Sequence, residues 1–289
     1  MRNTIIAGSV ALAALVSPQF ACAQTAAPAA EPAKSASPHT FTGNLGLVSD
    51  YRFRGISQTF KQPAIQGGFD YSHETGFYVG NWNSNVNSGA GFPGGSIEMD
   101  FYGGWKKTWD DWGLDLGTIY YYYPGTDANA TNFPANPRNG KTHTGGVNNW
   151  EIYIGGSWKW VSAKYYYAVS DYFSLPDTNG SRYFDLSANY DMGNGWTLLG
   201  HVGSFKLDNW KTGARNTDAN YTDWKIGVTK DLSGWILGAA YIDTNSKGSC
   251  STDVAGNTQF YCFGNSASGA TKFKDVGNST IVLSVSKTF

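Results

Sequence analysis

Residues 96–107 read SIEMDFYGGWKK, and this stretch decides the fold. Its apolar and polar residues alternate, with Ile97, Met99, Phe101 and Trp105 interleaved with Glu98, Asp100, Tyr102 and Lys106. A period of two places the two sets on opposite faces of a β-strand. One apolar face and one charged face over about ten residues are typical of a tilted strand that crosses a bilayer.

The same alternation recurs along the rest of the chain. It predicts twelve strands, at 42–53, 64–73, 76–84, 96–107, 111–123, 149–159, 161–170, 181–191, 195–207, 221–231, 234–243 and 278–289. A strand edge left unpaired in lipid would cost several kcal/mol for each unsatisfied backbone group. The last strand must therefore pair with the first, and we expect an all-β fold, a closed antiparallel transmembrane β-barrel of about twelve strands. The alternative is a sandwich in which the apolar faces pack between two layers.

The connections between these segments alternate in length. Short turns follow the even-numbered segments, whereas the odd-numbered connections are long, at 54–63, 85–95, 124–148, 171–180, 208–220 and 244–277. Outer-membrane barrels have short periplasmic turns and long extracellular loops, which a sandwich has no reason to reproduce. Aromatic residues cluster near the segment ends, where their rings suit the headgroup region.

The composition excludes several other classes of protein. Only 15% of the residues are charged, against roughly 25% in an ordinary soluble domain. Aromatic residues make up 16% of the chain, which does not fit intrinsic disorder. The net charge of −1 provides no basic field for nucleic acid. After residue 23 no apolar run is long enough for a transmembrane helix.

The N-terminus predicts export. Residues 1–23 have a short basic start, an apolar stretch and an A-x-A site, so we expect a signal peptide cleaved after Ala23. A short anchor helix and a lipoprotein acylated on Cys22 are the alternatives. Residues 24–40 are rich in Ala and Pro and predict a disordered linker, which leaves 41–289 for the barrel.

If the apolar face meets lipid, the charged residues of the other parity face the lumen. There are eight acidic and six basic ones: Asp50, Arg52, Arg54, Asp70, Glu98, Asp100, Lys106, Asp115, Glu151, Lys159, Lys164, Asp185, Asp223 and Lys225. Opposed charge rows favour polar solutes, and their near balance predicts no sharp ion selectivity. Alternatively, the charges pair across the lumen and plug it. Asp50, Arg52 and Arg54 are candidates for a constriction that holds a carboxylate or phosphate, or for a salt-bridged anchor of the first external loop.

Residues with other chemistry give weaker signals. Cys250 and Cys262 share the last external loop, and two cysteines in an oxidising compartment predict a disulfide rather than free thiols. His201 and Ser204 differ by three residues, so on a strand they face opposite sides, and no catalytic site is expected. No H-x-x-x-H or C-x-x-C motif is present, and we expect no metal or other cofactor. Acidic residues in the external loops could bind a divalent ion or simply be solvated: Asp127, Asp177 and Asp218.

The opening of the predicted barrel resembles a known family. Residues 44–59 (NLGLVSDYRFRGISQT), 63–71 (PAIQGGFDY) and 76–82 (GFYVGNW) are similar to the start of the TorF family of proteobacterial porins. The likeness is dense over residues 44–105 and looser as far as Phe289. It implies a channel in the outer membrane of Gram-negative bacteria and supplies no catalytic residues.

The last segment also resembles the C-terminal strand of bacterial outer-membrane proteins. Phe289 is its final residue, and Ile281, Leu283 and Val285 precede it at intervals of two, whereas Lys287 departs from the pattern. This resemblance implies recognition by the barrel-assembly machinery.

Together these features predict a porin-like channel for passive diffusion of small hydrophilic solutes. Twelve strands enclose more room than eight and less than sixteen, so the lumen should be narrow. The expected partners are outer-membrane lipid and small polar solutes, with no nucleic acid. The alternative is a barrel that does not conduct and serves as a surface interaction or structural protein through its extracellular loops.

Overall fold

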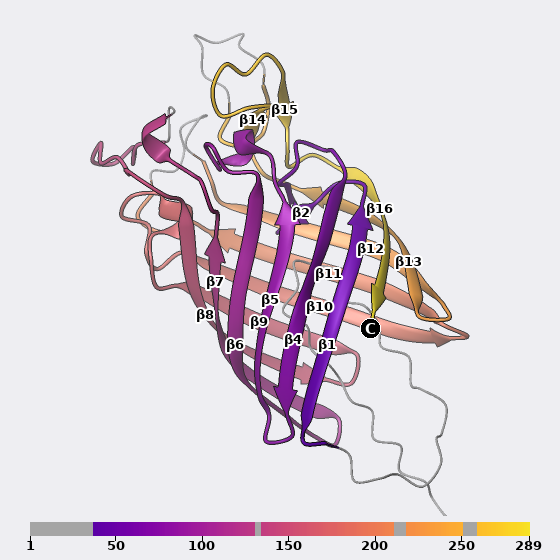
Figure 1. The fold of residues 1–289 in the computed structure, drawn as a ribbon. Coiled ribbons are helices and arrows are strands. Elements are labelled where there is room, and N and C mark those ends of the chain that lie inside the picture. Colours follow the sequence, from indigo (N-terminus) through magenta and orange to yellow (C-terminus); the bar gives the residue numbers. More distant parts are fainter. Residues whose placement is uncertain (1–36, 131–133, 211–217, 251–258) are drawn as a thin grey trace, which may run out of the picture.

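The computed structural model of the chain is a closed barrel with long loops at one end (Figure 1). It describes residues 37–130, 134–210, 218–250 and 259–289. The predicted signal peptide, its cleavage site and residues 24–36 of the predicted linker lie outside the described residues. The first strand begins at His39, so the last two residues assigned to the linker belong to the barrel instead.

Twelve antiparallel strands form the barrel wall, and they correspond one to one to the twelve predicted segments. In wall order each strand pairs with the next and the last closes on the first. In chain order they are β1 (His39–Val48), β4 (Ala64–His73), β5 (Phe77–Asn85), β6 (Ile97–Trp109), β7 (Trp112–Tyr122), β8 (Asn148–Trp158), β9 (Val161–Ala168), β10 (Arg182–Gly193), β11 (Trp196–Lys206), β12 (Tyr221–Leu232), β13 (Trp235–Thr244) and β16 (Thr280–Thr288). The predicted fold class is therefore confirmed.

The long loops carry the remaining short elements. These are two small hairpins, β2 (Arg52–Phe53) with β3 (Ile56–Ser57) and β14 (Cys262–Gly264) with β15 (Phe273–Asp275), and three 3-10 helices, η1 (Ser88–Ala90), η2 (Ala128–Ala130) and η3 (Tyr172–Ser174). Within the described ranges no helix is long and apolar enough to cross a membrane.

Strands β1 and β16 close the barrel. Their register runs from Val48 opposite Ser284 to Asn44 opposite Thr288. It continues one step further, because the Gly43 N–H donates to the Phe289 carbonyl at 2.7 Å and the Phe289 N–H donates back at 2.9 Å. A Cβ on Gly43 would lie 2.8 Å from Cε2 of the Phe289 ring, so glycine lets the ring lie against the strand. The pairing leaves no free edge in the wall, as the membrane requires.

The short turns at the other end are tight because several of their residues adopt left-handed backbone. Asn194 and Gly195 join β10 to β11 with φ values of 53° and 75°. Ser233 and Gly234 join β12 to β13 with φ values of 57° and 87°. Positive φ at both central residues is the geometry of two-residue hairpin turns that match strand twist. By analogy with outer-membrane barrels, this end is periplasmic and the long-loop end is extracellular.

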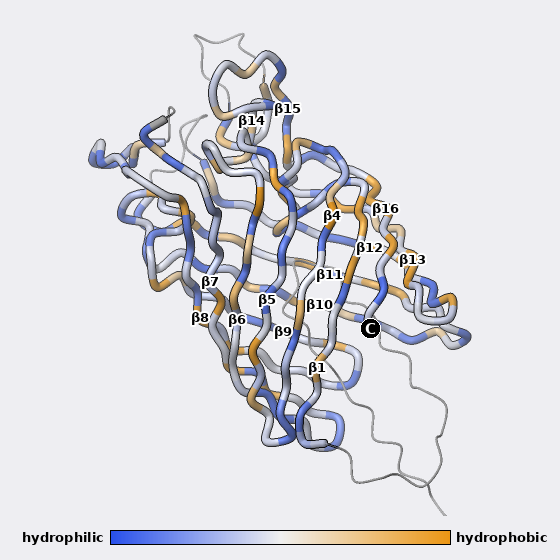
Figure 2. The backbone as a smooth tube through the Cα atoms, viewed as in Figure 1, coloured by the Kyte–Doolittle hydropathy of each residue, from blue (hydrophilic) through white to orange (hydrophobic). Residues whose placement is uncertain are grey.

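The outer surface is apolar and ringed with tryptophan near the periplasmic end. Hydropathy alternates along the strands (Figure 2), and large apolar side chains are exposed on the outside. Six tryptophans close to the short turns are between 43% and 55% exposed: Trp109, Trp112, Trp158, Trp160, Trp196 and Trp235. Such residues would be buried between layers in a sandwich, so the sandwich is excluded. The arrangement matches an aromatic belt at a membrane interface.

One boundary differs from the sequence expectation in a way that matters for function. The first strand was expected to run to residue 53, but β1 ends at Val48. Residues 49–63, which we call the inner loop, turn into the barrel and carry the β2–β3 hairpin.

Candidate functional site

The inner loop turns into the barrel from β1 and β4 and reaches toward β12 and β13. Its hairpin turns at Arg54 and Gly55, with φ values of 49° and 80°, the conformation of a two-residue turn. Gly55 lies close to β12 and β13, because a Cβ there would lie 2.7 Å from Cβ of Asp223 and 2.5 Å from Cγ2 of Thr244. The hairpin tip therefore lies against the inner wall at β13 and β12, two and three strands along the wall from β1.

Arg54 extends from this tip to β8. Its guanidinium donates two parallel hydrogen bonds to the Glu151 carboxylate, at 3.0 and 2.7 Å. It also donates to the Tyr172 hydroxyl at 3.2 Å. The Arg54 and Glu151 side chains are only 4% and 1% exposed. A bidentate pair of this kind fixes both position and orientation.

Aromatic rings surround the Arg54 guanidinium. Its Cζ lies 4.4 Å from the ring centre of Tyr183, 4.7 Å from Phe53 and 5.1 Å from Tyr166. Cation–π contacts with desolvated rings offset part of the cost of burying the charge. Burial by itself lowers the pKa of Arg54, but the Glu151 carboxylate outweighs it and raises the pKa, so the guanidinium stays charged.

Arg52 anchors the base of the hairpin. Its Nε donates to Asp50 at 2.6 Å, and its Nη1 donates to the carbonyl of Gly55 at 2.9 Å. The same Nη1 donates to the carbonyls of Val276 at 2.9 Å and Asn278 at 3.1 Å, in the last external loop. The Arg52 side chain is completely buried. Arg52 with Asp50 therefore forms the salt-bridged loop anchor that the sequence left open, while Arg54 alone reaches across the lumen.

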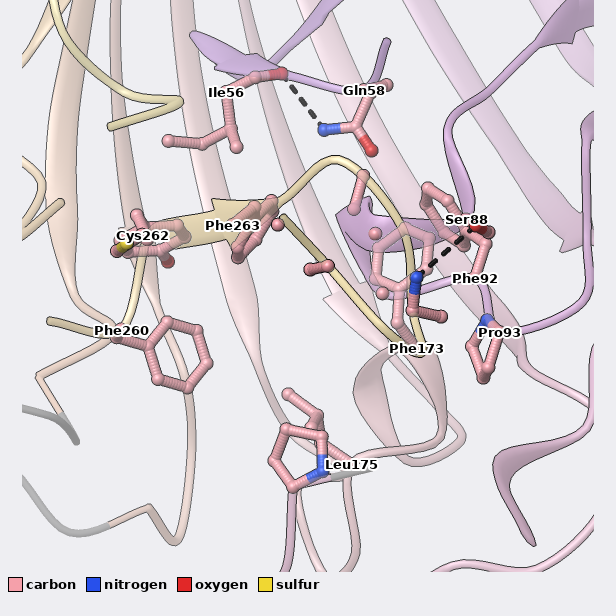
Figure 3. Close-up of a pocket in the computed structure, with 18 of the residues that line it drawn as sticks. Ile56, Gln58, Ser88, Phe92, Pro93, Phe173, Leu175, Phe260, Cys262 and Phe263 are labelled. Carbon is pink, nitrogen blue, oxygen red and sulfur yellow. Dashed lines mark hydrogen bonds between the residues drawn. The ribbon is translucent and has the colours of Figure 1, made fainter. Parts of the chain in front are cut away.

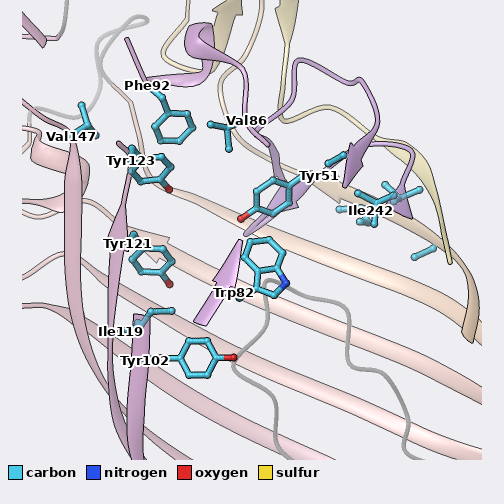
Figure 4. Packing of buried hydrophobic residues seen from close by; sticks show 14 of the residues in the cluster. Tyr51, Trp82, Val86, Phe92, Tyr102, Ile119, Tyr121, Tyr123, Val147 and Ile242 are labelled. Carbon is cyan, nitrogen blue, oxygen red and sulfur yellow. The ribbon is translucent and has the colours of Figure 1, made fainter. Parts of the chain in front are cut away.

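Two carboxyl groups lie beside the inner loop on β6. Glu98 and Asp100 are each 1% exposed, and the Tyr51 hydroxyl donates to Glu98 at 3.1 Å. In this cluster burial raises the pKa of Tyr51, which keeps its hydroxyl protonated as a donor. Figure 4 shows Tyr51 beside Trp82, facing a column of tyrosines that includes Tyr121 and Tyr123. These rings belong to one cluster of buried side chains inside the barrel at this level.

Two further sets of charged and polar side chains lie on the inner wall, nearer the periplasmic end of the barrel. Lys164 on β9 pairs with Asp115 on β7 at 2.6 Å, and the Tyr78 hydroxyl donates to the same Asp115 at 2.6 Å. On β4, Asp70 accepts from the Tyr102 hydroxyl at 2.6 Å. These groups follow the wall and do not reach the inner loop's Arg54.

A second network, centred on His201, joins β10, β11 and β12. The His201 ring nitrogens lie 3.2 Å from Asp185 and 2.9 Å from Asp223. The Tyr183 hydroxyl donates to Asp223 at 2.9 Å, and Lys225 is buried on the same inner face. The sequence had predicted Asp185, Asp223 and Lys225 as lumen residues but not the role of His201 between them. The sequence signal for this role was the position of His201 on β11, where the alternation of the strand turns its side chain inward.

Lys159 does not lie where the alternation places it. Strand β8 ends at Trp158, and Lys159 follows in the turn with a φ of 52°. Its side chain is 48% exposed and faces Asp111 of the neighbouring turn at 3.7 Å. The prediction was wrong because the turn already begins at Lys159, whereas the alternation of apolar and polar residues continues through that position. The other predicted lumen residues lie on the inner wall or on the inner loop.

The residues weighed for other chemistry are also placed. His201 faces inward and Ser204 outward, so they do not meet. Hydrogen bonds from Lys141 and Asn139 to Asp177 lower the pKa of that exposed carboxyl. No group of three or more metal-ligating side chains occurs in the described ranges. Cys250 and Cys262 form the predicted disulfide, with Cα atoms 5.2 Å apart.

Comparison with known proteins places the chain in a family. Residues 32–289 match the profile of Gcw_chp, described as a bacterial protein of unknown function. The chain belongs to this family. The match does not identify the chain as a TorF porin, so that resemblance stays a prediction. No curated protein matches the sequence.

Several solved structures are similar in shape at very low sequence identity. A KdgM porin in complex with disordered oligogalacturonate is 6% identical, with a TM-score of 0.47 over 86% of this chain and 99% of that chain. A NanC porin is 10% identical, with a TM-score of 0.48 over the same shares. The outer membrane protein OprD from Pseudomonas aeruginosa is 9% identical, with a TM-score of 0.37 over 82% of this chain and 61% of that chain.

Proposed function

We propose that this protein is an outer-membrane channel through which small hydrophilic solutes diffuse passively, by a narrow and charged lumen. The observation that carries the proposal is the inversion of the barrel: apolar residues are exposed outside, and charged residues line the inside. A polar interior on a closed barrel is the arrangement through which water and polar solutes cross a bilayer.

The narrowest level of this channel is the inner loop. At that level Arg54 pairs with Glu151 of the wall strand β8, with Asp50 and Arg52 holding the loop in place. A passing solute must contact or displace these groups. Because their charges are paired, we expect low conductance and weak ion selectivity rather than a strongly charged filter.

The proposal includes a cellular location, the bacterial outer membrane. The chain is exported with its signal peptide cleaved after Ala23, and the strand ending at Phe289 is recognised by the barrel-assembly machinery. The exposed apolar surface and the tryptophan belt support a membrane location.

A second candidate is a barrel that conducts nothing and acts through its external loops. It is favoured by the burial of the inner loop, whose Arg52 side chain is completely buried and whose Arg54 side chain is 4% exposed. In this second candidate the paired charges plug the lumen, which is the alternative to an open lumen that the sequence allowed.

Single-channel recording in planar bilayers separates the two. We expect small steps from the wild type. For Arg54→Ala we expect a conductance about twofold higher or more, and a reversal potential shifted toward cations because Glu151 is left unpaired. Arg54→Ala/Glu151→Ala should raise conductance without the shift. Lys159→Ala, which removes an exposed charge in a turn, is the matched control and should change neither.

Absence of current from the wild type and from both Arg54 variants, all properly folded, would refute the channel and leave the second candidate. Current that ignores all of these substitutions would instead remove the inner loop from the conduction path.

A further inference from the structure

The aromatic rings at the two ends of the barrel are placed differently. At the extracellular end, Phe92, Phe173 and Phe260 line a space between the loops (Figure 3). At the periplasmic end the tryptophans lie on the outer wall instead and form the tryptophan belt. The belt is not uniform around the barrel, because lysines alternate with the tryptophans on one sector of the wall.

Four successive strands of the wall make up this sector. Near the short turns they carry Trp196 on β11, Lys230 on β12, Trp235 on β13 and Lys287 on β16, which we call the Trp–Lys row. Trp196 lies directly opposite Lys230, and Trp235 lies directly opposite Lys287. Residues directly opposite share a face of the sheet, so both lysines face outward like the tryptophans. In Figure 1 the C-terminal label marks the end of β16, where the row lies.

Each lysine of the row holds its ammonium beside an indole ring. Nζ of Lys230 lies 5.1 Å from the ring centre of Trp196, and Nζ of Lys287 lies 5.0 Å from that of Trp235. Lys230 also donates to the carbonyl of Asn194 in the turn between β10 and β11. Both lysines are half-buried, so their methylene stems lie along the wall while the charged ends stay at the edge of the bilayer.

A third lysine at the same end has a partner that the row lacks. Nζ of Lys159 lies 5.0 Å from the ring centre of Trp158, and the carboxylate of Asp111 lies 3.7 Å from the same ammonium. No carboxylate of the described residues lies within 4.0 Å of the ammonium of Lys230 or Lys287. Three lysines therefore share one geometry, but only the two in the row have no ion pair within the described part of the chain.

The carboxylates of the adjoining turns are turned away from the row. Asp191 accepts from the Gly193 N–H at 2.7 Å, and Asp231 accepts from the Gly234 N–H at 2.7 Å. Asp231 directly follows Lys230 on β12, so the two side chains point to opposite faces of the strand. Among the described residues the outer face of the row is thus basic.

The surface between the two lysines is apolar. Leu237 on β13 lies opposite Lys230 and is 42% exposed, and Val285 on β16 lies opposite Leu237. Neighbouring strands are about 4.8 Å apart and each residue rises about 3.4 Å, so the Cα atoms of Lys230 and Lys287 are about 12 Å apart. Two flexible lysine side chains can approach one headgroup from this separation. A ligand at the row therefore meets positive charge at the bilayer edge and an apolar surface beside it.

From these observations we infer that the Trp–Lys row binds a phospholipid with an anionic headgroup in the periplasmic leaflet, with its acyl chains against Leu237 and Val285. The lysines attract the negative headgroup, and the indole rings suit the headgroup region. This role gives a physical reason for Lys287 at a position where terminal strands usually carry an aromatic residue. The inference rests on the membrane location in the proposed function but not on conduction.

Native mass spectrometry of the full-length protein, refolded in detergent at low ionic strength, tests the inference. The probes are phosphatidylglycerol and phosphatidylcholine with identical acyl chains, which differ in net charge. With about fivefold in affinity for each lysine near an anionic headgroup, we expect the wild type to prefer phosphatidylglycerol about 25-fold. Lys230→Gln or Lys287→Gln should each reduce the preference to about fivefold, and the double variant should have none.

Lys159→Gln is the matched control, because it removes a lysine with the same indole contact that already has a carboxylate partner. It should keep the full preference. Lys230→Arg/Lys287→Arg retains the charge and should keep it as well. Millimolar inorganic phosphate should not displace the bound lipid, because it brings no acyl chains.

Equal binding of the two lipids by the wild type would overturn the inference. So would an equal loss of preference in Lys159→Gln and in the double glutamine variant, loss of preference in the folded arginine variant, or displacement of the lipid by inorganic phosphate. Lipid binding is measured without current, so a barrel that conducts nothing can still pass this test. Failure of the lipid site and failure of the channel are therefore distinguishable.

Discussion

The two halves of the lumen are built on different principles. The extracellular half is packed like the interior of a soluble protein, with the inner loop, the Arg54–Glu151 pair and stacked aromatic rings almost fully buried. The periplasmic half is lined by groups that stay on the wall, such as the Lys164–Asp115 pair, and by small inward residues that are only partly buried, including Ser72, Gly113, Ser157, Ser162 and Gly238. Wall side chains alone do not fill a twelve-stranded barrel, which is wider than the eight-stranded kind that side chains just fill.

The difference between the halves comes from the inserted loop. The loop, rather than the wall, occupies the interior of the extracellular half. The charged pairs differ in burial in the same way. The Arg54–Glu151 pair beside the inner loop is buried, whereas the Lys159–Asp111 pair in the periplasmic turns is about half exposed.

The largest expected effect comes from removing the inserted loop's contacts. Replacing residues 52–57 by Gly-Ser-Gly-Ser-Gly-Ser should make the extracellular half resemble the periplasmic half and raise single-channel conductance by about an order of magnitude. The same replacement at 139–144, in a surface loop, is the control. If the two replacements give equal conductance, the halves do not differ in the way described.

The next effect tests whether water reaches the buried charges of the extracellular half. Glu151→Gln leaves the buried Arg54 charge without its partner and should cost about 3 kcal/mol of unfolding free energy. Glu74→Gln, at an exposed turn position, should cost almost nothing. Urea titration of the refolded barrel, followed by tryptophan fluorescence, measures both. A cost below about 1 kcal/mol for Glu151→Gln would mean that water reaches the pair.

A smaller and local effect is expected from the external loops. Cys250→Ser/Cys262→Ser removes a cross-link that spans 12 residues, worth about 2–3 kcal/mol to the loop it closes. We expect faster proteolytic cleavage of that loop in intact vesicles, with the barrel's urea midpoint unchanged. Reduction of the wild type should reproduce the result. A lowered midpoint would show that the loop also supports the wall.

The smallest effect is expected at the periplasmic turns. Lys159→Ala breaks a pair in which both side chains are about half exposed, and should change the unfolding free energy by less than about 0.5 kcal/mol. The same urea titration measures it. A larger loss would indicate that these turns are less solvated than their exposure implies.

The wall could be predicted from sequence because its cause is local. Successive side chains of every strand face the lipid and the lumen in turn, so stretches such as 96–107 reveal their structure within ten residues. The same rule explains its own failures, at Lys159 and at the end of β1. In both places the alternation continues past the true end of the strand.

The constriction could be predicted only in part. Asp50, Arg52 and Arg54 were identified because they keep the inward parity, yet they lie on a hairpin and not on a strand. Glu151 lies 97 residues from its partner Arg54, and no pattern near either residue links them. Such pairings depend on how a loop folds back through the barrel, which short-range periodicity does not encode.

The bonds from Arg52 to the carbonyls of Val276 and Asn278 link the two ends of the barrel sequence. The hairpin near the start of the barrel gains them only when the loop before the final strand is in place. An incomplete chain would therefore lack the Arg52 contacts, and these contacts and the closing seam of β1 with β16 would form at the same late stage.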